Sequence, residues 1–104
     1  MLLFKKKFLP AILAGTKLQT IRLWNVLRYR AGQRSYIPGA GYIRIETIDR
    51  VTLDELTEQD ALLDGFENLA ALHNELKTMY AEELAAGHQA YRVAFRLLPE
   101  TESP

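Results

Sequence analysis

The sequence predicts an α+β domain: a small, mostly antiparallel sheet curled into a barrel, with helices in its connections. Two observations predict the sheet. Residues 42–51 form the longest β-like run, and residues 89–98 alternate apolar and polar side chains as a half-buried strand does. A third predicts helices between these runs, because N-cap residues open two segments there. Closing the sheet would remove exposed edges from a small domain.

The amino-terminal part predicts a short helix among short strands. Pro10 suits the first turn of this helix and Gly15 is placed to end it. Turn residues on both sides isolate the last of the strands. We therefore expect strands at 2–4, 20–24 and 33–37, and the helix at 8–14.

The run 42–51 departs from strict alternation. Ile43 and Ile45 share one face, but Ile48 and Val51 do not keep period two with them. A β-bulge inserts one residue and restores the register, so we expect one near Glu46 and Thr47.

Helices follow this strand. Thr57, with Asp60 three residues later, predicts a capped helix that runs through Leu63, and Asn68 caps a second with leucines at helical spacing. The acidic residues between 54 and 67 are interpreted as caps and solvated helix positions. The strand at 89–98 closes the fold.

Length and composition indicate one domain at 1–98 with a disordered tail at 99–104. The 104 residues contain no cysteine, which excludes disulfides and thiol catalysis. The start MLLFKKKFLP does not match a signal peptide, and no apolar run is long enough to span a bilayer. We expect a cytoplasmic protein.

Charge is strongly polarised along the chain. Residues 1–50 carry ten cations and two anions, a net charge of +8, whereas residues 51–104 carry three cations and eleven anions, a net charge of −8. One interpretation is a basic face for a polyanion and an acidic back. The alternative is that the two halves pack together and neutralise each other.

The segment GTKLQTIR at residues 15–22 is the most informative stretch. It places Lys17, Thr20 and Arg22 beside a glycine, directly after the short helix. A cation, a hydroxyl and a flexible backbone within eight residues suit an anionic or amide-bearing ligand. The alternative is a solvated loop.

Five segments in this order resemble the ASCH domain of the PUA-like superfamily. They are GTKLQTIR (15–22), YRAGQRSYI (29–37), GYIRIETIDRVTLDELTEQDA (41–61), DGFENLAALHNEL (64–76) and AYRVAFRL (90–97). The resemblance covers residues 2 to about 98. It implies a PUA-like β-barrel of about five or six strands whose first helix and following loop line a cleft for RNA or nucleosides.

Some small bacterial proteins of this family are amidohydrolases that deacetylate N(4)-acetylcytidine. The resemblance implies that Lys17 and Thr20 match their catalytic lysine and threonine. The glutamate of those enzymes corresponds by counting to Ala71, which does not titrate. Glu67 and Glu75 lie one helical turn to either side and are the candidates to replace it.

The chemistry of Lys17 and Thr20 leaves two interpretations open. In the first, Thr20 attacks an amide and Lys17 accepts its proton, which requires burial and a nearby cation such as Arg22 to lower the pKa of Lys17. Residues two apart on a strand face the same side, so Thr20 and Arg22 are expected together. In the second, Lys17 stays charged and holds a phosphate or carbonyl group.

Other residues are candidates for contacts with a ligand. Arg22 and Arg34 suit a phosphate or a base edge, or they pair with acidic residues such as Glu46. Trp24 either stacks on a base or belongs to the core. Lys6, within the run 5–7, either clamps a phosphate backbone or is solvated.

The sequence predicts neither a metal site nor a cofactor, since the two histidines have no distinctive carboxylate at ligand spacing. Three functions follow from these observations. The first is RNA or nucleoside binding in a basic cleft around GTKLQTIR. The second is amide hydrolysis of an acylated cytidine nucleoside, and the third is an interaction domain without catalysis. The oligomeric state is not predicted.

Overall fold

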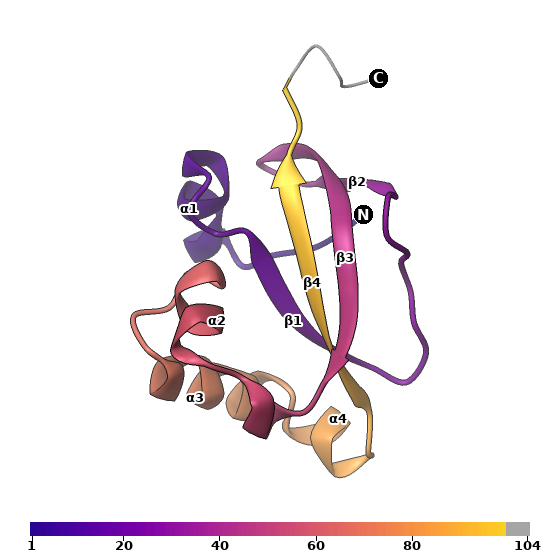
Figure 1. The fold of residues 1–104 in the computed structure, drawn as a ribbon, viewed down its shortest axis with the longest axis vertical. Coiled ribbons are helices and arrows are strands. Elements are labelled where there is room, and N and C mark those ends of the chain that lie inside the picture. Colours follow the sequence, from indigo (N-terminus) through magenta and orange to yellow (C-terminus); the bar gives the residue numbers. More distant parts are fainter. Residues whose placement is uncertain (100–104) are drawn as a thin grey trace.

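The computed structural model of the chain describes residues 1–99. Its centre is one antiparallel sheet with the strand order β1-β4-β3-β2, and the sheet curls about the long axis of the molecule (Figure 1). β1 and β2 are therefore its two edges. The strands are β1 (Gln19–Trp24), β2 (Arg34–Ile37), β3 (Gly41–Val51) and β4 (Gln89–Leu97).

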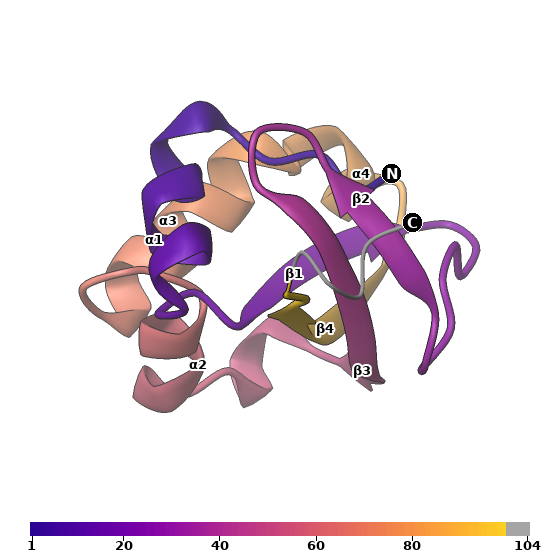
Figure 2. The same cartoon turned by 90° about the horizontal axis from the view of Figure 1, so that it is seen from above.

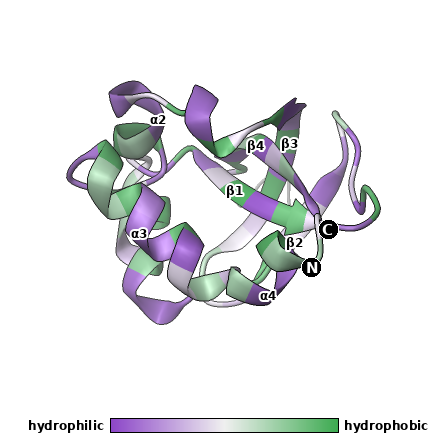
Figure 3. Cartoon of the chain, turned by 90° about the horizontal axis from the view of Figure 1, so that it is seen from below, coloured by the Kyte–Doolittle hydropathy of each residue, from purple (hydrophilic) through white to green (hydrophobic). Residues whose placement is uncertain are grey.

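Helices occupy the amino-terminal segment before β1 and the connection between β3 and β4. Viewed from above, α1 and α3 lie toward the edge of the sheet that β1 forms, and β2 and β3 lie farther from these helices (Figure 2). In Figure 3, hydrophobic and hydrophilic residues alternate around α3, as they do in an amphipathic helix. The helices are η1 (Lys6–Phe8), α1 (Leu9–Ala14), η2 (Leu53–Glu55), α2 (Glu58–Leu63), α3 (Leu69–Met79) and α4 (Ala81–Ala85).

The helix ends follow the local chemistry of the sequence. The hydroxyl of Thr57 accepts from the amide of Asp60 and completes a capping box, and Asn68 accepts from the amide of Ala71. Gly15 ends α1 with φ 77°, a left-handed conformation that favours glycine. The predicted caps and the end of the first helix are confirmed.

Two apolar clusters lie on opposite faces of the sheet. Val93 and Phe95 of β4 belong to one cluster, which the amino-terminal segment covers through Leu2 and Ile12. Ala90, an odd number of residues away, belongs to the other, which contains Leu72 and Leu76 of α3. The sheet thus separates two hydrophobic cores. β1, at one edge of the sheet, contributes side chains to both.

The bulge in β3 is confirmed. Pairing with β4 shifts register between Ile45 and Thr47, so Glu46 is the extra residue. Ile48 consequently packs with Ile43 and Ile45 in one core, while Val51 packs in the other. The bulge explains why this strand departs from period two.

Three expectations differ from the structure. Within residues 1–99 the sheet has four strands rather than five or six. Residues 2–4 do not form a strand. The amide of Leu2 donates a single hydrogen bond to β2, to the carbonyl of Tyr36 at 2.9 Å, and the Leu2 side chain is buried in the core. The helix α4 was not expected. The predicted tail at 99–104 lies outside the described residues except for Pro99.

Candidate functional site

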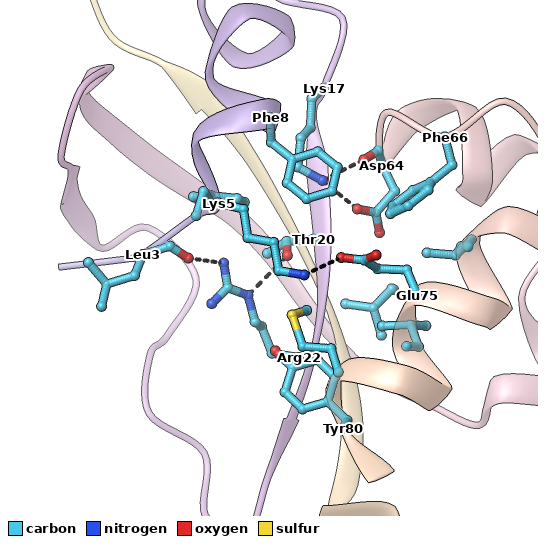
Figure 4. Close-up of a pocket in the computed structure, with 15 residues that line it drawn as sticks. Leu3, Lys5, Phe8, Lys17, Thr20, Arg22, Asp64, Phe66, Glu75 and Tyr80 are labelled. Carbon is cyan, nitrogen blue, oxygen red and sulfur yellow. Dashed lines mark hydrogen bonds and ion pairs between the residues drawn. The ribbon is translucent and has the colours of Figure 1, made fainter.

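A cavity of about 310 Å³ opens along the free edge of β1. The amino-terminal segment forms one side of it and α3 forms the other, as Figure 4 shows. Aliphatic and aromatic residues share its apolar wall, and the aromatic ones are Phe4, Phe8, Phe66 and Tyr80. Its polar lining comes mainly from the GTKLQTIR segment and from two carboxylates. A concave apolar site with a few convergent polar groups is the usual form of a small-ligand site.

Backbone hydrogen bonds place Lys17 at the inner end of the cavity. After Gly15, the amides of Thr16 and Lys17 both donate to the carbonyl of Ala11. The amide of Leu18 then donates to the carbonyl of Leu63 at 2.8 Å. These bonds hold the loop against the carboxyl end of α2, so the side chain of Lys17 meets the residue that follows that helix.

That residue is Asp64. The Nζ atom of Lys17 donates to Oδ1 of Asp64 and to its backbone carbonyl. Lys17 is 2% exposed and Asp64 is 3% exposed. A pair this buried is screened little by solvent, and its two charges depend on each other.

Burial pushes both members of this pair toward their neutral forms. It lowers the pKa of Lys17, and the neighbouring Arg22 lowers it further, while Asp64 opposes the shift. Burial raises the pKa of the Asp64 carboxyl, against the attraction of Lys17. The second carboxyl oxygen of Asp64, Oδ2, is buried without a hydrogen-bond partner. Such an atom is costly to leave unpaired, so a donor brought by a ligand would be favoured here.

Aromatic rings surround the Lys17 ammonium group. Its Nζ atom lies 4.7 Å from the ring centre of Phe8, 5.5 Å from that of Phe4 and 5.9 Å from that of Phe66. The faces of these rings attract a cation that has been stripped of water. They therefore offset part of the cost of burying the lysine and also shape the cavity wall.

Thr20 and Arg22 lie on the same side of β1, as expected. The Nε atom of Arg22 donates to Oγ1 of Thr20 at 3.0 Å, and Nη2 donates to the carbonyl of Leu3 at 2.6 Å. The guanidinium group lies 4.7 Å from the ring centre of Phe4. Because the Thr20 oxygen accepts from a cation, negative charge that develops on it would be stabilised.

Glu75 reaches the same cavity from α3. Its carboxylate accepts from Lys5 at 3.0 Å and from Lys7 at 3.3 Å. The bond from Lys5 holds the pKa of Glu75 below its usual value. Glu67, the other candidate, is exposed and does not line the cavity, so the structure brings Glu75 and not Glu67 to Lys17 and Thr20.

Three other predicted ligand contacts lie outside the cavity wall. Trp24 packs between the rings of Tyr29 and Tyr91, at 5.7 and 5.6 Å between centres. Arg34 lies on β2, and Lys6 is exposed in η1. Their roles in binding stay predictions.

Asp64 was missed by the sequence reasoning, which assigned the acidic residues at 54–67 to caps and solvent. Its neighbour Asp60 does fit that assignment, since it caps α2 and also accepts two bonds from Arg92. Sequence order alone does not distinguish the two. The bond between Leu18 and Leu63, which are far apart in the sequence, brings the segment of Lys17 against Asp64.

Within residues 1–99, no cluster of three or more histidine, aspartate or glutamate side chains is arranged to hold a metal ion. Over the same residues, none of the helices has the length and apolar character that crossing a bilayer requires.

Comparison with solved structures shows that the chain has an ASCH-like fold. It superposes on an ASCH domain from Lactobacillus crispatus JV V101 with a TM-score of 0.71 and 17% identity, over 85% of this chain and 68% of that one. Protein EF3133 from Enterococcus faecalis V583, described as DUF984, gives a TM-score of 0.73 and 17% identity, over 88% of this chain and 67% of that one.

A third solved structure, the hypothetical protein PH0355, gives a TM-score of 0.77 at 14% identity and covers 92% of this chain and 95% of that one. No protein-family model matches the sequence, and no curated protein matches it either. At these identities the likeness shows the fold alone. The function has to be argued from the cavity.

Proposed function

We propose that the cavity binds a nucleoside, either free or as one unstacked base of an RNA strand. The observation that carries this proposal is the combination of aromatic walls with a buried, polar inner end formed by Lys17, Asp64 and Thr20. Unstacked bases are recognised by stacking on aromatic rings and by hydrogen bonds to their edges. The cavity offers both kinds of contact.

Size supports a single small ligand. About 310 Å³ is at the lower end of the range for small-molecule sites, roughly 300–1,000 Å³. This volume suits one nucleoside rather than a stack of bases. Phe8 and Phe66, whose ring centres lie 5.4 Å apart, stand beside the polar end, where a planar ring would contact them.

The polar groups differ in what they offer a base edge. Oδ2 of Asp64 accepts a hydrogen bond and has no partner, so it favours an exocyclic amine or a ring N–H. Arg22 supplies N–H donors for a base or sugar oxygen. Because base edges carry donors and acceptors side by side, a mixed set of this kind favours a base over a simple anion.

Calorimetric titration with the four common ribonucleosides tests this proposal. We expect saturable binding of at least one, weakened about tenfold in Arg22→Gln, since losing one charge-assisted hydrogen bond costs about 1.5 kcal/mol. Arg50→Gln is the matched control, because Arg50 is exposed and does not line the cavity. Equal affinity in both variants, or no binding by any nucleoside at millimolar concentration, would contradict the proposal.

A second candidate function is hydrolysis of the amide of an N(4)-acetylcytidine-type nucleoside. Two observations favour it: the lowered pKa of Lys17, and the presence of Glu75 in the same cavity although Ala71 occupies the expected position. A lysine with a lowered pKa is a better proton acceptor at neutral pH.

The proposed reaction uses Thr20 as the nucleophile. Its Oγ1 bonds to the acyl carbon, the bond from that carbon to the exocyclic nitrogen breaks, and the hydroxyl proton passes through Lys17 to the leaving amine. Water then hydrolyses the threonine ester and releases acetate. In this proposal Arg22 stabilises charge on the threonine oxygen, and Glu75, which lines the same cavity, accepts the proton of that water.

Incubation with N(4)-acetylcytidine, followed by chromatography for cytidine, tests this candidate. We expect turnover that is lost in Thr20→Val, which keeps the shape of the side chain and removes the nucleophile. Glu75→Gln should slow the reaction, whereas Glu67→Gln, on an exposed residue of the same region, should not. Full activity in Thr20→Val would refute the mechanism, and inactivity in both assays would favour an interaction domain.

A further inference from the structure

The outer face of the β2–β3 hairpin carries a second polar surface, away from the helices α2 to α4 (Figure 1). Along β2, Ser35 and Ile37 are buried, and along β3, Ile43 and Ile45 are buried. The residues that alternate with them point to the opposite side of the sheet. We call this surface the arginine–tyrosine face; its members are Arg34, Tyr36, Tyr42, Arg44 and Arg96.

Three arginines form a row across this face. Arg34 is the direct cross-strand partner of Arg44, and Arg44 is the partner of Arg96. Side chains directly opposite each other are about 5 Å apart at Cβ, and like charges there destabilise a sheet. Glu46 lies 3.7 Å from Arg96, but both side chains are about half exposed, so this pair compensates little.

A row of cations suits a polyanion, because each phosphate contact releases condensed counterions. The amino-terminal half of the chain, with its net charge of +8, supplies two of these arginines.

Aromatic rings lie beside the arginine row. Tyr36 and Tyr42 are cross-strand partners whose ring centres are 5.1 Å apart, and the guanidinium group of Arg34 lies 5.4 Å from the ring centre of Tyr42. Tyr36 is 40% exposed. Paired rings that are fixed on a sheet and flanked by cations are a platform on which bases stack.

We infer that the arginine–tyrosine face binds single-stranded nucleic acid, with the arginine row on phosphates and Tyr36 stacked on a base. This surface is separate from the cavity, and none of its members lines the cavity. A purely acidic polypeptide would use the cations but would have no base for the ring. The combination therefore favours nucleic acid.

Fluorescence anisotropy with a labelled 12-nucleotide oligouridylate tests the phosphate contacts. In Arg44→Gln/Arg96→Gln we expect the slope of log affinity against log salt to flatten by about 1.4, since each single-strand phosphate contact contributes about 0.7. Arg50→Gln/Lys77→Gln removes two exposed cations elsewhere and is the matched control. Thermal melting should show both variants folded.

The base contact is tested with Tyr36→Leu, which keeps an apolar side chain but removes the ring. We expect at least about fivefold weaker binding of oligouridylate, because stacking on one base contributes roughly that factor or more. With an abasic oligomer of the same length, Tyr36→Leu and the unchanged protein should bind equally.

Three outcomes would overturn the inference. One is an unchanged salt slope in Arg44→Gln/Arg96→Gln, and another is unchanged oligouridylate affinity in Tyr36→Leu. The third is competition by polyglutamate as effective, per charge, as that by unlabelled oligouridylate, which would assign the face to an acidic polypeptide. Arg22→Gln tests the cavity independently, so failure of one site is distinguishable from failure of the other.

Discussion

Replacing Asp64 by asparagine probes the buried pair on which the cavity depends. The change keeps the shape of the side chain but removes its negative charge, so Lys17 is left at 2% exposure without a counter-ion. Breaking a buried ion pair costs about 3–5 kcal/mol. The bond from Lys17 to the Asp64 carbonyl and the three surrounding rings remain. We therefore expect a loss near the lower end, about 3 kcal/mol at pH 7.

The pH dependence of this loss has a definite sign. In the folded, unchanged protein, Lys17 and Asp64 together hold one titratable proton, whether the pair is ionised or neutral. The unfolded chain also holds one proton on these two groups at neutral pH, so the pair adds no pH dependence to stability there. In Asp64→Asn, burial lowers the pKa of Lys17 without the opposing carboxylate. Unfolding then takes up a proton, so the loss is largest at low pH. It shrinks as pH rises toward about 10.4, the value for an unfolded lysine.

Urea denaturation of both proteins between pH 7 and pH 10 measures this difference. Asp49→Asn is the control, because Asp49 is exposed. Lys17→Met/Asp64→Leu removes both charges and should recover most of the stability, as apolar replacements of buried pairs commonly do. A loss below about 1 kcal/mol at pH 7 in Asp64→Asn, with no dependence on pH, would show that Lys17 does not depend on Asp64 as its counter-ion.

Three further predictions concern neighbouring groups. Asp60→Asn should lower the free energy of unfolding by about 2 kcal/mol in urea denaturation, because Asp60 accepts from Arg92 at 2.7 and 3.0 Å and caps α2; a loss equal to that of Asp49→Asn would contradict this. Glu75→Gln should reduce the decrease in Tm between pH 5 and pH 3, because the lowered pKa of Glu75 contributes stability that is lost as the pH falls. The same decrease in Tm in both proteins would contradict this. Phe66→Leu should weaken nucleoside binding by about fivefold in calorimetry, through loss of one stacking ring, and unchanged affinity would exclude Phe66 as a contact.

Local chemistry made most of the fold predictable. The caps at Thr57 and Asn68, the end of α1 at Gly15 and the bulge at Glu46 each depend on residues within one turn or one strand pair. The segment at residues 2–4 was predicted wrongly because its apolar residues fill a core without joining the ladder. Pattern alone does not separate these two ways of burying a side chain.

The candidate site was only partly predictable. Lys17, Thr20 and Arg22 come together because they share one short segment, which the sequence displays directly. Asp64 and Glu75 reach the cavity through contacts between elements far apart in the chain, and those contacts depend on how α2 and α3 pack. The spacing of residues along the sequence does not indicate which distant elements pack together.

A crystal structure with the tightest-binding nucleoside tests the central claim most directly. We expect the base to lie between the amino-terminal segment and α3, against Phe8 or Phe66, with a donor within about 3.2 Å of Oδ2 of Asp64. Nucleoside bound elsewhere on the chain, with the cavity along β1 closed by its own side chains, would contradict it.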